Sequence, residues 1–356
     1  MATYFPLQGF ILILGIIAFG ATYLIFKTFY KIFRLKTNAL FYFIVIASAL
    51  LFVIGSALET LHTEITRELY VASAIWAGTL FIAFWIVLLV LLASIFVSIQ
   101  NKTFGFVLIG IIILLSIYAV YHSSDTQIHE TSLTTKKFNE SLKIVELSDL
   151  HLGAVRSTSF VRKIVDLTNS ANPDIVVIAG DLFDGTGIYD ENILSPFNDI
   201  KVPTYFILGN HDIYTGTEVV LKYINSTQIH VIRNNKVDYR NIQIIGIDDS
   251  SDPLQAPDRL ENISFDKNKY SILLYHRPDG FEQVSNEGID LMLSGHTHAG
   301  QIFPFGILEN LLLYKHLSGE YSYNNSNLIV LEGVGTWGPP MRLGTDSEIM
   351  LIKINS

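Results

Sequence analysis

Four long stretches without a charged residue dominate the first third of the chain and constrain its fold more than any other feature. The stretches are Leu7–Phe26, Ala39–Leu58, Val71–Ile99 and Phe104–Tyr121. Because a helix of about 20 apolar residues crosses the hydrocarbon core of a bilayer, each stretch is long enough to span a membrane. Buried helices of a globular domain seldom stay uncharged over such lengths. We therefore predict a four-helix transmembrane anchor over residues 1–121.

The charges between the stretches predict the orientation of this anchor. The first loop is basic and carries Lys27, Lys31, Arg34 and Lys36. The second is mostly acidic and carries Glu59, Glu64, Arg67 and Glu68. The third is short and carries Lys102. Basic loops face the cytoplasm, so we expect the first and third loops there and the remainder of the chain on the extracytoplasmic side. The spans have no ionisable residue in their middles, which argues against a transporter. Residues 1–6 carry no positive charge, so we interpret the first stretch as a retained anchor and not as a signal peptide.

The remaining two thirds of the chain are acidic. Residues 122–356 contain 18 Lys and Arg against 30 Asp and Glu, whereas residues 1–121 contain six against three. An acidic surface repels nucleic-acid backbones, so we expect no nucleic-acid partner. The chain has no cysteine, which excludes disulfides and thiolate metal sites. We interpret residues 122–140 as a polar linker, with His122 and His129 solvated, and residues 141–356 as one soluble domain.

Five strand-like runs in the soluble domain each end in a cluster of Asp, Asn or His. The runs are Lys143–Leu147, Asp174–Ala179, Thr204–Leu208, Tyr270–Tyr275 and Leu291–Leu293. The clusters that follow them contain Asp149 and His151; Asp181 and Asp184; Asn210, His211 and Asp212; His276; and His296 and His298. A single Asp after a strand is usually a turn former or a helix cap. In an α/β architecture, however, ligands bind at the carboxyl ends of the strands, so five such ends are expected to bring these groups together.

The side chains of these clusters suit a pair of divalent cations. Two cations about 3.5–4 Å apart need oxygen and nitrogen ligands and a carboxylate that bridges them. Asp149, Asp181 and Asn210 offer oxygen, and the histidines of the other clusters offer imidazole. Imidazole together with carboxylate favours Mn, Fe or Zn over Mg or Ca. We expect Gly295 to provide the bend that turns the two histidines after it into one site.

Taken together, the clusters resemble the five sequence blocks of the calcineurin-like metallophosphoesterase superfamily. The blocks are Asp149-x-His151, Gly180-Asp181-x-x-Asp184, Gly209-Asn210-His211-Asp212, His276 and Gly295-His296-x-His298. They occur in order over about residues 142–300, and the resemblance implies an α/β fold, a four-layer αββα sandwich of two mixed β-sheets. The segments His276-Arg277-Pro278-Asp279, Gln301 and Pro340-x-Arg342 resemble the YkuE/YaeI-like branch, which includes proteins with several membrane helices before the phosphoesterase domain. Ala299 departs from that branch, where glycine is expected.

The resemblance also implies a role for each residue. The first metal would be held by Asp149, His151 and His298. The second would be held by Asn210, His276 and His296. Asp181 would bridge the two metals. A hydroxide between the metals would attack phosphorus in line, and His211 would protonate the leaving oxygen or stabilise the transition state. Asp212 would orient His211, and Asp184 would support the metal ligands from behind. Apart from the resemblance, the loop over Gly333–Pro340 leaves two alternatives: a lip over the site with Arg342 near a substrate phosphate, or a purely structural loop.

These roles predict a membrane-anchored phosphoesterase whose catalytic domain spans residues 141–356 and whose substrate is a phosphate ester or a pyrophosphate. The anchor makes a lipid-linked phosphate a candidate substrate. The alternative is a metal-binding or signalling protein that has lost turnover on the same fold; the presence of His211, which is not a ligand, favours the enzyme. Phe303 and Phe305 could meet a lipid tail or the bilayer surface, but we expect ordinary core packing. Asp248, Asp249 and Asp252 could recruit a third cation or shape the pocket, but we expect a solvated turn before Pro253.

Overall fold

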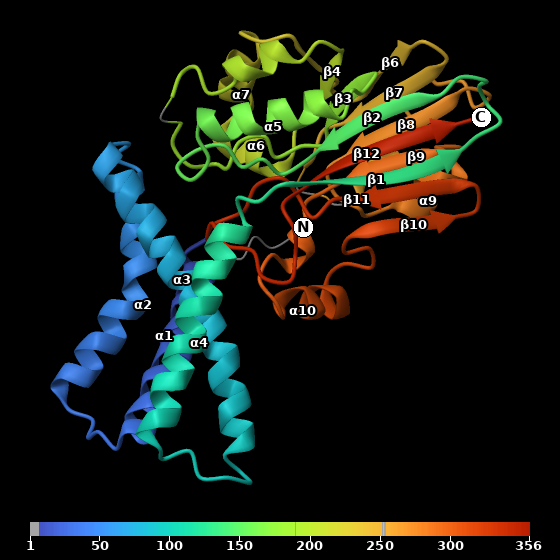
Figure 1. Cartoon of the computed structure of the whole chain (residues 1–356). Helices are drawn as coiled ribbons and strands as arrows, with labels where there is room; N and C mark the ends of the chain where they lie inside the picture. Colours follow the sequence, from blue (N-terminus) through green and yellow to red (C-terminus); the bar gives the residue numbers. More distant parts are fainter. Residues whose placement is uncertain (1–6, 189, 251, 253) are drawn as a thin grey trace. The chain divides into compact units, whose positions relative to one another are not determined.

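The computed structural model describes residues 7–188, 190–250, 252 and 254–356. The chain forms two compact units, and Figure 1 labels their helices and strands. The first unit comprises residues up to 121 together with residues 339–341, and the second comprises residues 122–338 and 342–356. Each unit is described below by itself.

Four long helices make up most of the first unit: α1 (Leu7–Phe33), α2 (Ala39–Glu59), α3 (Glu64–Ala93) and α4 (Lys102–His122). All four are long and apolar enough to cross a membrane, which confirms the prediction of four apolar helices. The third helix begins and ends earlier than its uncharged stretch. It begins at Glu64 because Thr63 and Thr66 form a capping box, in which the Thr63 hydroxyl accepts from the Thr66 N–H at 3.2 Å.

The second unit contains two six-stranded mixed sheets. In spatial order, the first sheet consists of β1 (Gln127–Thr134), β12 (Glu348–Asn355), β2 (Leu142–Leu147), β3 (Ile175–Ile178), β4 (Thr204–Phe206) and β5 (Ile229–Val231). The second consists of β10 (Gly319–Tyr323), β11 (Ser326–Val330), β9 (Leu291–Ser294), β8 (Tyr270–Tyr275), β7 (Ile242–Ile247) and β6 (Asn235–Tyr239). Strands β2, β3 and β4 run parallel to one another, as do β7, β8 and β9. Their carboxyl ends therefore lie at one edge of each sheet.

The two sheets face each other across a shared apolar core. Alternate residues of each strand point to opposite faces, so Ile144 of β2 enters this shared core, whereas its neighbour Val145 lies on the outer face. The outer face of the first sheet packs against α5 (Thr158–Ser170), α7 (Thr217–Ile224) and a short 3-10 helix, Ser195–Asp199. The outer face of the second sheet packs against α8 (Gln255–Leu260) and α9 (Phe281–Asn286). This arrangement confirms the predicted four-layer αββα sandwich.

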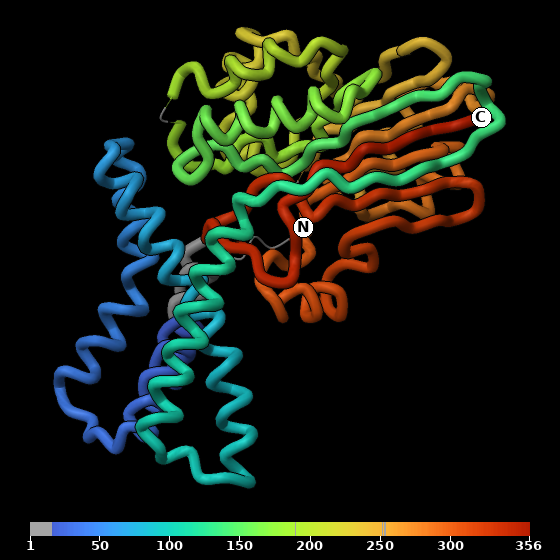
Figure 2. Tube along the Cα trace, in the orientation of Figure 1, coloured from blue at the N-terminus to red at the C-terminus, as the bar shows by residue number. Residues whose placement is uncertain are grey.

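The stretch predicted to be a linker contains a strand. Strand β1 pairs in parallel with β12 over its whole length, and Figure 2 traces the two strands side by side at the sheet edge. Its side chains are mostly polar because an edge strand buries little of its surface, which is why the apolar pattern did not reveal it. His122 and His129 are partly exposed, and each also contacts an acid: His122 Nε2 lies 2.9 Å from Asp346, and His129 Nδ1 lies 2.8 Å from Glu348.

Candidate metal centre

The residues predicted to bind metal follow five strands of the two facing sheets. Asp149 and His151 follow β2, Asp181 follows β3, and Asn210 is the first residue of α6 (Asn210–Thr215), directly after β4. From the second sheet, His276 follows β8, and two further histidines, His296 and His298, follow β9. The structure brings all seven side chains to the same edge of the sandwich.

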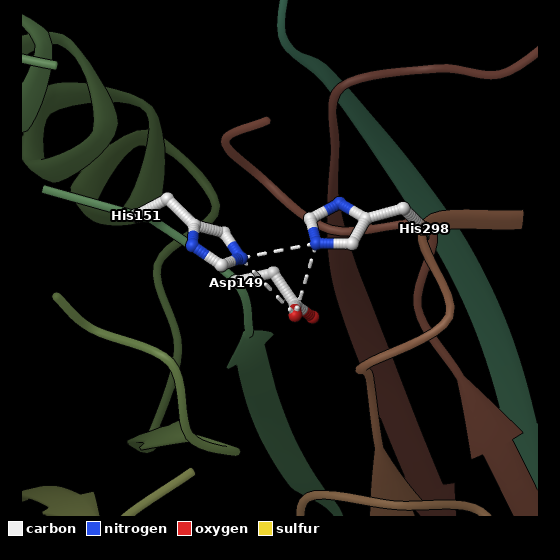
Figure 3. Close-up of side chains that lie close together, drawn as sticks. All are labelled: Asp149, His151 and His298. Carbon is white, nitrogen blue, oxygen red and sulfur yellow. Dashed lines mark hydrogen bonds and ion pairs between the residues drawn. The ribbon is translucent and has the colours of Figure 1, made fainter. Parts of the chain in front are cut away.

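Asp149, His151 and His298 form one trio of converging ligand atoms (Figure 3). His298 Nε2 lies 3.4 Å from Asp149 Oδ1 and 3.0 Å from His151 Nε2. All three side chains are at least nine-tenths buried. Two imidazole nitrogens so close to each other and to a carboxylate oxygen fit the ligand set of a divalent cation.

Asp181, His276 and His296 form a second trio beside the first. His276 Nε2 lies 3.0 Å from Asp181 Oδ2 and 3.3 Å from His296 Nδ1. The same Asp181 oxygen lies 3.8 Å from His151 Nε2 of the first trio. Asp181 therefore lies between the two groups of histidines, as does Asp149, whose Oδ1 lies 3.9 Å from His276 Nε2.

Asn210 provides a direct test of whether these residues fit a metal ion. Its Oδ1 is buried and has no hydrogen-bond partner among the residues that the structure describes. An unpaired buried amide oxygen costs about 1–3 kcal/mol, so such oxygens are normally paired. A cation bound beside Asn210 would satisfy this oxygen, and the donor set of oxygen and imidazole suits Mn, Fe or Zn.

The backbone at the site is strained. Asp149, His151, Asp181, His296 and His298 all have φ between 48° and 76°, in the left-handed region that residues other than glycine seldom occupy. Such residues cluster at functional sites, where the surrounding structure holds the strained conformation in place. Ala299, where the resemblance suggested glycine, has a φ of 51° as well. A glycine there would adopt this conformation at less cost.

Gly295 has a different role from the one predicted. The bend after β9 lies at the two histidines, whose φ angles are positive, and Gly295 itself does not have a positive φ. A side chain at position 295 would instead overlap the Ser148 hydroxyl and the Asp149 carboxylate. The glycine is needed because β2 and β9, from different sheets, approach each other closely here.

His211 lies next to the first trio. Its ring is 4.8 Å from the ring of His151, and its backbone N–H donates to Asp181 Oδ1 at 2.8 Å. Its Nδ1 lies 2.6 Å from the carbonyl oxygen of Asp184. Because a carbonyl oxygen only accepts, Nδ1 must carry the proton in this bond. The Asp184 carboxylate lies 3.0 Å from His151 Nδ1, which is the usual support for a metal-binding histidine.

Asp212 does not contact His211 through its side chain as predicted. Its carboxylate accepts from the backbone N–H groups of Phe183 and Gly209, both at 2.9 Å. It therefore ties the loop after β3 to the start of α6. The carbonyl of Asp184 takes the place that the prediction gave to the Asp212 carboxylate.

Arg342 cannot contact a substrate in this structure, so the structural alternative for its loop is the one that the contacts support. It is fully buried and donates to the backbone carbonyls of Glu332, Gly333 and Gly335 at 2.6–2.9 Å. These residues begin a loop that runs to Trp337. The loop contacts the site, because the Gly335 N–H donates to the Asp149 carbonyl at 2.7 Å. Arg342 thus holds a loop that packs against a predicted metal ligand.

Sequence reasoning did not predict the contacts that three residues make around His296. Arg277 Nη1 and the Tyr314 hydroxyl each lie 3.0 Å from His296 Nε2, and Arg277 Nε lies 2.9 Å from both carboxylate oxygens of Asp249. Asp249 and its neighbour Asp248 are buried, so the predicted solvated turn is wrong at both positions. The His-Arg-Pro-Asp segment already singled out Arg277, but neither Tyr314 nor Asp249 carried a sequence signal.

The carboxylates of the site raise the pKa of two of its histidines. Burial alone would lower the pKa of His151, but the carboxylates of Asp149 and Asp184 outweigh burial and raise this pKa to about 10. The Asp181 carboxylate likewise overcomes burial and raises the pKa of His276 to about 9. For His298, burial dominates and lowers the pKa to about 3. The cluster is therefore built to hold positive charge among its carboxylates.

Comparison with known proteins identifies the family. The sequence profile described as calcineurin-like phosphoesterase matches residues 142–300. A Helicobacter pylori protein named as a metallophosphoesterase is 35% identical over 236 residues, which cover 64% of each chain. A Campylobacter jejuni protein with a similar name is 33% identical over 349 residues, which cover 93% of this chain and 91% of that protein. A Danio rerio protein, named as a transmembrane protein with a metallophosphoesterase domain, is 32% identical over 263 residues, or 67% of this chain and 60% of that protein.

The chain spans less than two thirds of the Helicobacter and Danio relatives but most of the Campylobacter protein. Its four apolar helices and its likeness to a transmembrane relative indicate a membrane protein. The near full-length match, the matched profile and the converging side chains agree with one another. The chain therefore belongs to the calcineurin-like metallophosphoesterase family.

Proposed function

We propose that this protein is a membrane-anchored hydrolase of a phosphate ester or a pyrophosphate and that it uses two divalent cations, with Mn, Fe and Zn as the candidates. The observation that carries this proposal is the convergence of seven ligand side chains from five strand ends of two sheets. The unpaired Asn210 oxygen supports it independently. A lone cluster of acidic residues would not, because such clusters are common without a metal.

Each cation has its own residues in this proposal. Asp149, His151 and His298 would hold the first, Asn210, His276 and His296 would hold the second, and Asp181 would be shared by both. The bridging role is supported by the Asp181 Oδ2 atom, which lies within 3.8 Å of one histidine from each group. Two bound cations supply Lewis acidity toward phosphoryl oxygens and lower the pKa of the attacking water.

His211 supplies the proton for the leaving oxygen in the proposed reaction. Its Nδ1 is occupied by the Asp184 carbonyl, so Nε2 is the nitrogen that exchanges a proton with the substrate. The hydrogen bond to a carbonyl also fixes the orientation of the ring, which a general acid requires. The Trp337 ring, 58% exposed, lies 6.1 Å from the His211 ring and borders the same space.

The charges of the membrane anchor indicate on which side of the membrane the reaction takes place in this proposal. Four basic residues in the first loop against three acidic residues in the second favour an extracytoplasmic catalytic unit. A substrate with a phosphate group at a membrane surface, such as a lipid-linked phosphate, suits an enzyme confined to that surface.

The proposal is tested by turnover of the purified full-length chain in detergent. The protein is stripped with a chelator and reloaded separately with Mn²⁺, Fe²⁺ or Zn²⁺, and hydrolysis of para-nitrophenyl phosphate and its diester is measured. The His211→Ala variant should keep the metal content of the parent but lose rate by about 10²–10⁴-fold, the usual contribution of a general acid. Exposed His230 on β5 provides the matched control, and His230→Ala should retain full rate.

Two outcomes would contradict the proposal. If metal-loaded His211→Ala hydrolyses the esters as fast as the parent, the proton role of His211 is wrong. If the parent binds metal but hydrolyses neither these esters nor a set of phospholipids and pyrophosphates, the chain is a metal-binding protein without turnover on the same fold.

A further inference from the structure

A short helix beside the metal centre carries an exposed apolar surface. This helix, α10 (Phe305–Leu312), has no buried residue. We define the α10 surface as its exposed apolar side chains and those that flank it: Phe303, Phe305, Ile307, Leu308, Leu311, Leu312 and Leu313. Their exposed fractions range from 37% for Leu308 to 76% for Leu312. The prediction that Phe303 and Phe305 pack in the core is therefore wrong.

The α10 surface has the composition of a segment that enters a bilayer interface. Between Phe303 and Tyr314 the one charged residue is Glu309, and it is half-buried. Figure 1 shows α10 as a separate helix that is not stacked on either sheet. Soluble surfaces rarely expose so many neighbouring large apolar side chains, and a contiguous patch of this kind marks an interaction site.

The segment that carries this surface is connected to the metal centre at both ends. On its amino side, the chain passes from His298 through a short 3-10 helix, His298–Gly300, to Phe303. On its carboxyl side, the hydroxyl of Tyr314 lies 3.0 Å from His296 Nε2. A partner that binds the α10 surface would therefore lie next to the proposed catalytic cations.

The segment that follows α4 enters the second unit at the edge of the sandwich that carries the candidate metal centre. Helix α4 ends at His122 and β1 begins at Gln127, which pairs with Glu348 at the start of β12. Because β12 is antiparallel to β2, the start of β12 lies near the carboxyl end of β2, which leads to Asp149. The start of β1 therefore lies at the edge of the sandwich that carries Asp149.

We propose that the α10 surface inserts into the interface of the bilayer that holds the anchor and that it delivers an amphiphilic phosphate ester to the metal centre. Segments that are rich in Phe and Leu and carry few charges bind to the bilayer interface because they bury apolar surface there. The proposed substrate is a phosphate head group on an apolar tail. If α10 lies in the bilayer interface, the metal centre beside it lies at the same depth as the lipid head groups. This second part rests on the proposed function, whereas the insertion of α10 does not.

Insertion is tested with a fluorescent label on the full-length chain. The protein has no cysteine, so Leu312→Cys accepts a single environment-sensitive label. The labelled protein is reconstituted in nanodiscs of phosphatidylcholine and phosphatidylglycerol that contain doxyl-labelled lipid. We expect the label at position 312 to be quenched at least about twofold more than a label on Asn325→Cys. Asn325 is exposed in the turn between β10 and β11, at the opposite edge of the sheet.

Delivery of the substrate is tested by comparing two phosphate monoesters, one held in a bilayer and one soluble. The double variant L311S/L312S should hydrolyse a long-chain alkyl phosphate in nanodiscs about tenfold more slowly than the parent, because two leucines no longer favour insertion. Its rate on soluble para-nitrophenyl phosphate should be unchanged. Val219→Ser provides the matched control, since Val219 is an exposed apolar residue of α7 and should not affect either substrate.

The outcomes separate the two proposals. Equal quenching at positions 312 and 325 would overturn insertion, whatever the activity. A rate that falls equally on both substrates in L311S/L312S would overturn delivery. Strong quenching at position 312 in a protein that hydrolyses no ester would support insertion and reject the proposed function.

Discussion

Replacing Arg342 with methionine separates a structural role for this arginine from a role in substrate binding. The guanidinium is fully buried and donates to the carbonyls of Glu332, Gly333 and Gly335, and to the Thr345 hydroxyl at 3.3 Å. Methionine has a comparable length and no donor. The substitution therefore removes the hydrogen bonds and leaves little empty volume.

The expected loss of stability follows from counting the acceptors left without a donor. The Gly333 carbonyl keeps the backbone N–H of Glu348 at 3.2 Å. The carbonyls of Glu332 and Gly335 keep no other donor in the part of the chain that the structure describes. Each unpaired buried carbonyl costs about 1–3 kcal/mol, so the variant should lose roughly 2–6 kcal/mol. For a unit of this size, that corresponds to a fall in Tm of about 5–20 °C.

The assay uses the natural distribution of tryptophan. The chain has three tryptophans, of which Trp76 and Trp85 lie in α3 and Trp337 lies in the loop that Arg342 holds. In a background where the two helical tryptophans are phenylalanine, fluorescence reports on this loop during thermal unfolding. A variant that keeps the parental Tm but shows a raised KM for a soluble phosphate ester would refute the structural role and restore a substrate contact for Arg342.

Two further predictions concern the glycine after β9 and the acid of α10. Gly295→Ala should weaken metal binding by about 10–100-fold in calorimetric titration, because the new methyl group displaces the Asp149 carboxylate, whereas Gly110→Ala in α4, where the methyl group meets open space, should bind metal as the parent does. Unchanged affinity in Gly295→Ala would mean that Asp149 is not a ligand. Burial raises the pKa of Glu309 from 4.5 to about 7, so its contribution to stability is complete below about pH 4.5 and is lost as the pH rises through 7. The Tm of Glu309→Gln should therefore fall less than that of the parent between about pH 5 and pH 8, and parallel curves would contradict the raised pKa.

Three of the five strands before the predicted metal ligands were predictable because their sequences are almost entirely apolar. Strands β3, β8 and β9 are buried at every position, and a strand covered on both faces has no polar side to interrupt the pattern. Strands β1, β6 and β10 were not predicted. They lie at or near sheet edges and expose several of their side chains, so the same pattern is absent from them.

The residues that support the ligands depend on contacts that local sequence does not encode. Asp212 follows His211 directly, yet its carboxylate binds backbone N–H groups from the loop after β3. The sequence left open whether Arg342 approaches a substrate phosphate, because a lone arginine gives no indication that three carbonyls will surround it. Tyr314 reaches His296 from 18 positions further along the chain. Such partners are set by the tertiary fold and not by spacing in the sequence.

The strained backbone at the site explains why the ligands follow fully buried strands. Five of the seven predicted ligand residues adopt left-handed φ angles, at a cost of roughly 1–3 kcal/mol each. Their sum is comparable to the whole net stability of a domain, about 5–15 kcal/mol. Only a surrounding structure with a large gain from burial can hold such a set, and the strands that precede the ligands lie in the apolar layers shared by the two sheets. A site on mobile surface loops would relax to ordinary φ angles and move the imidazoles apart, so the two-sheet core is a condition for the metal centre as well as its support.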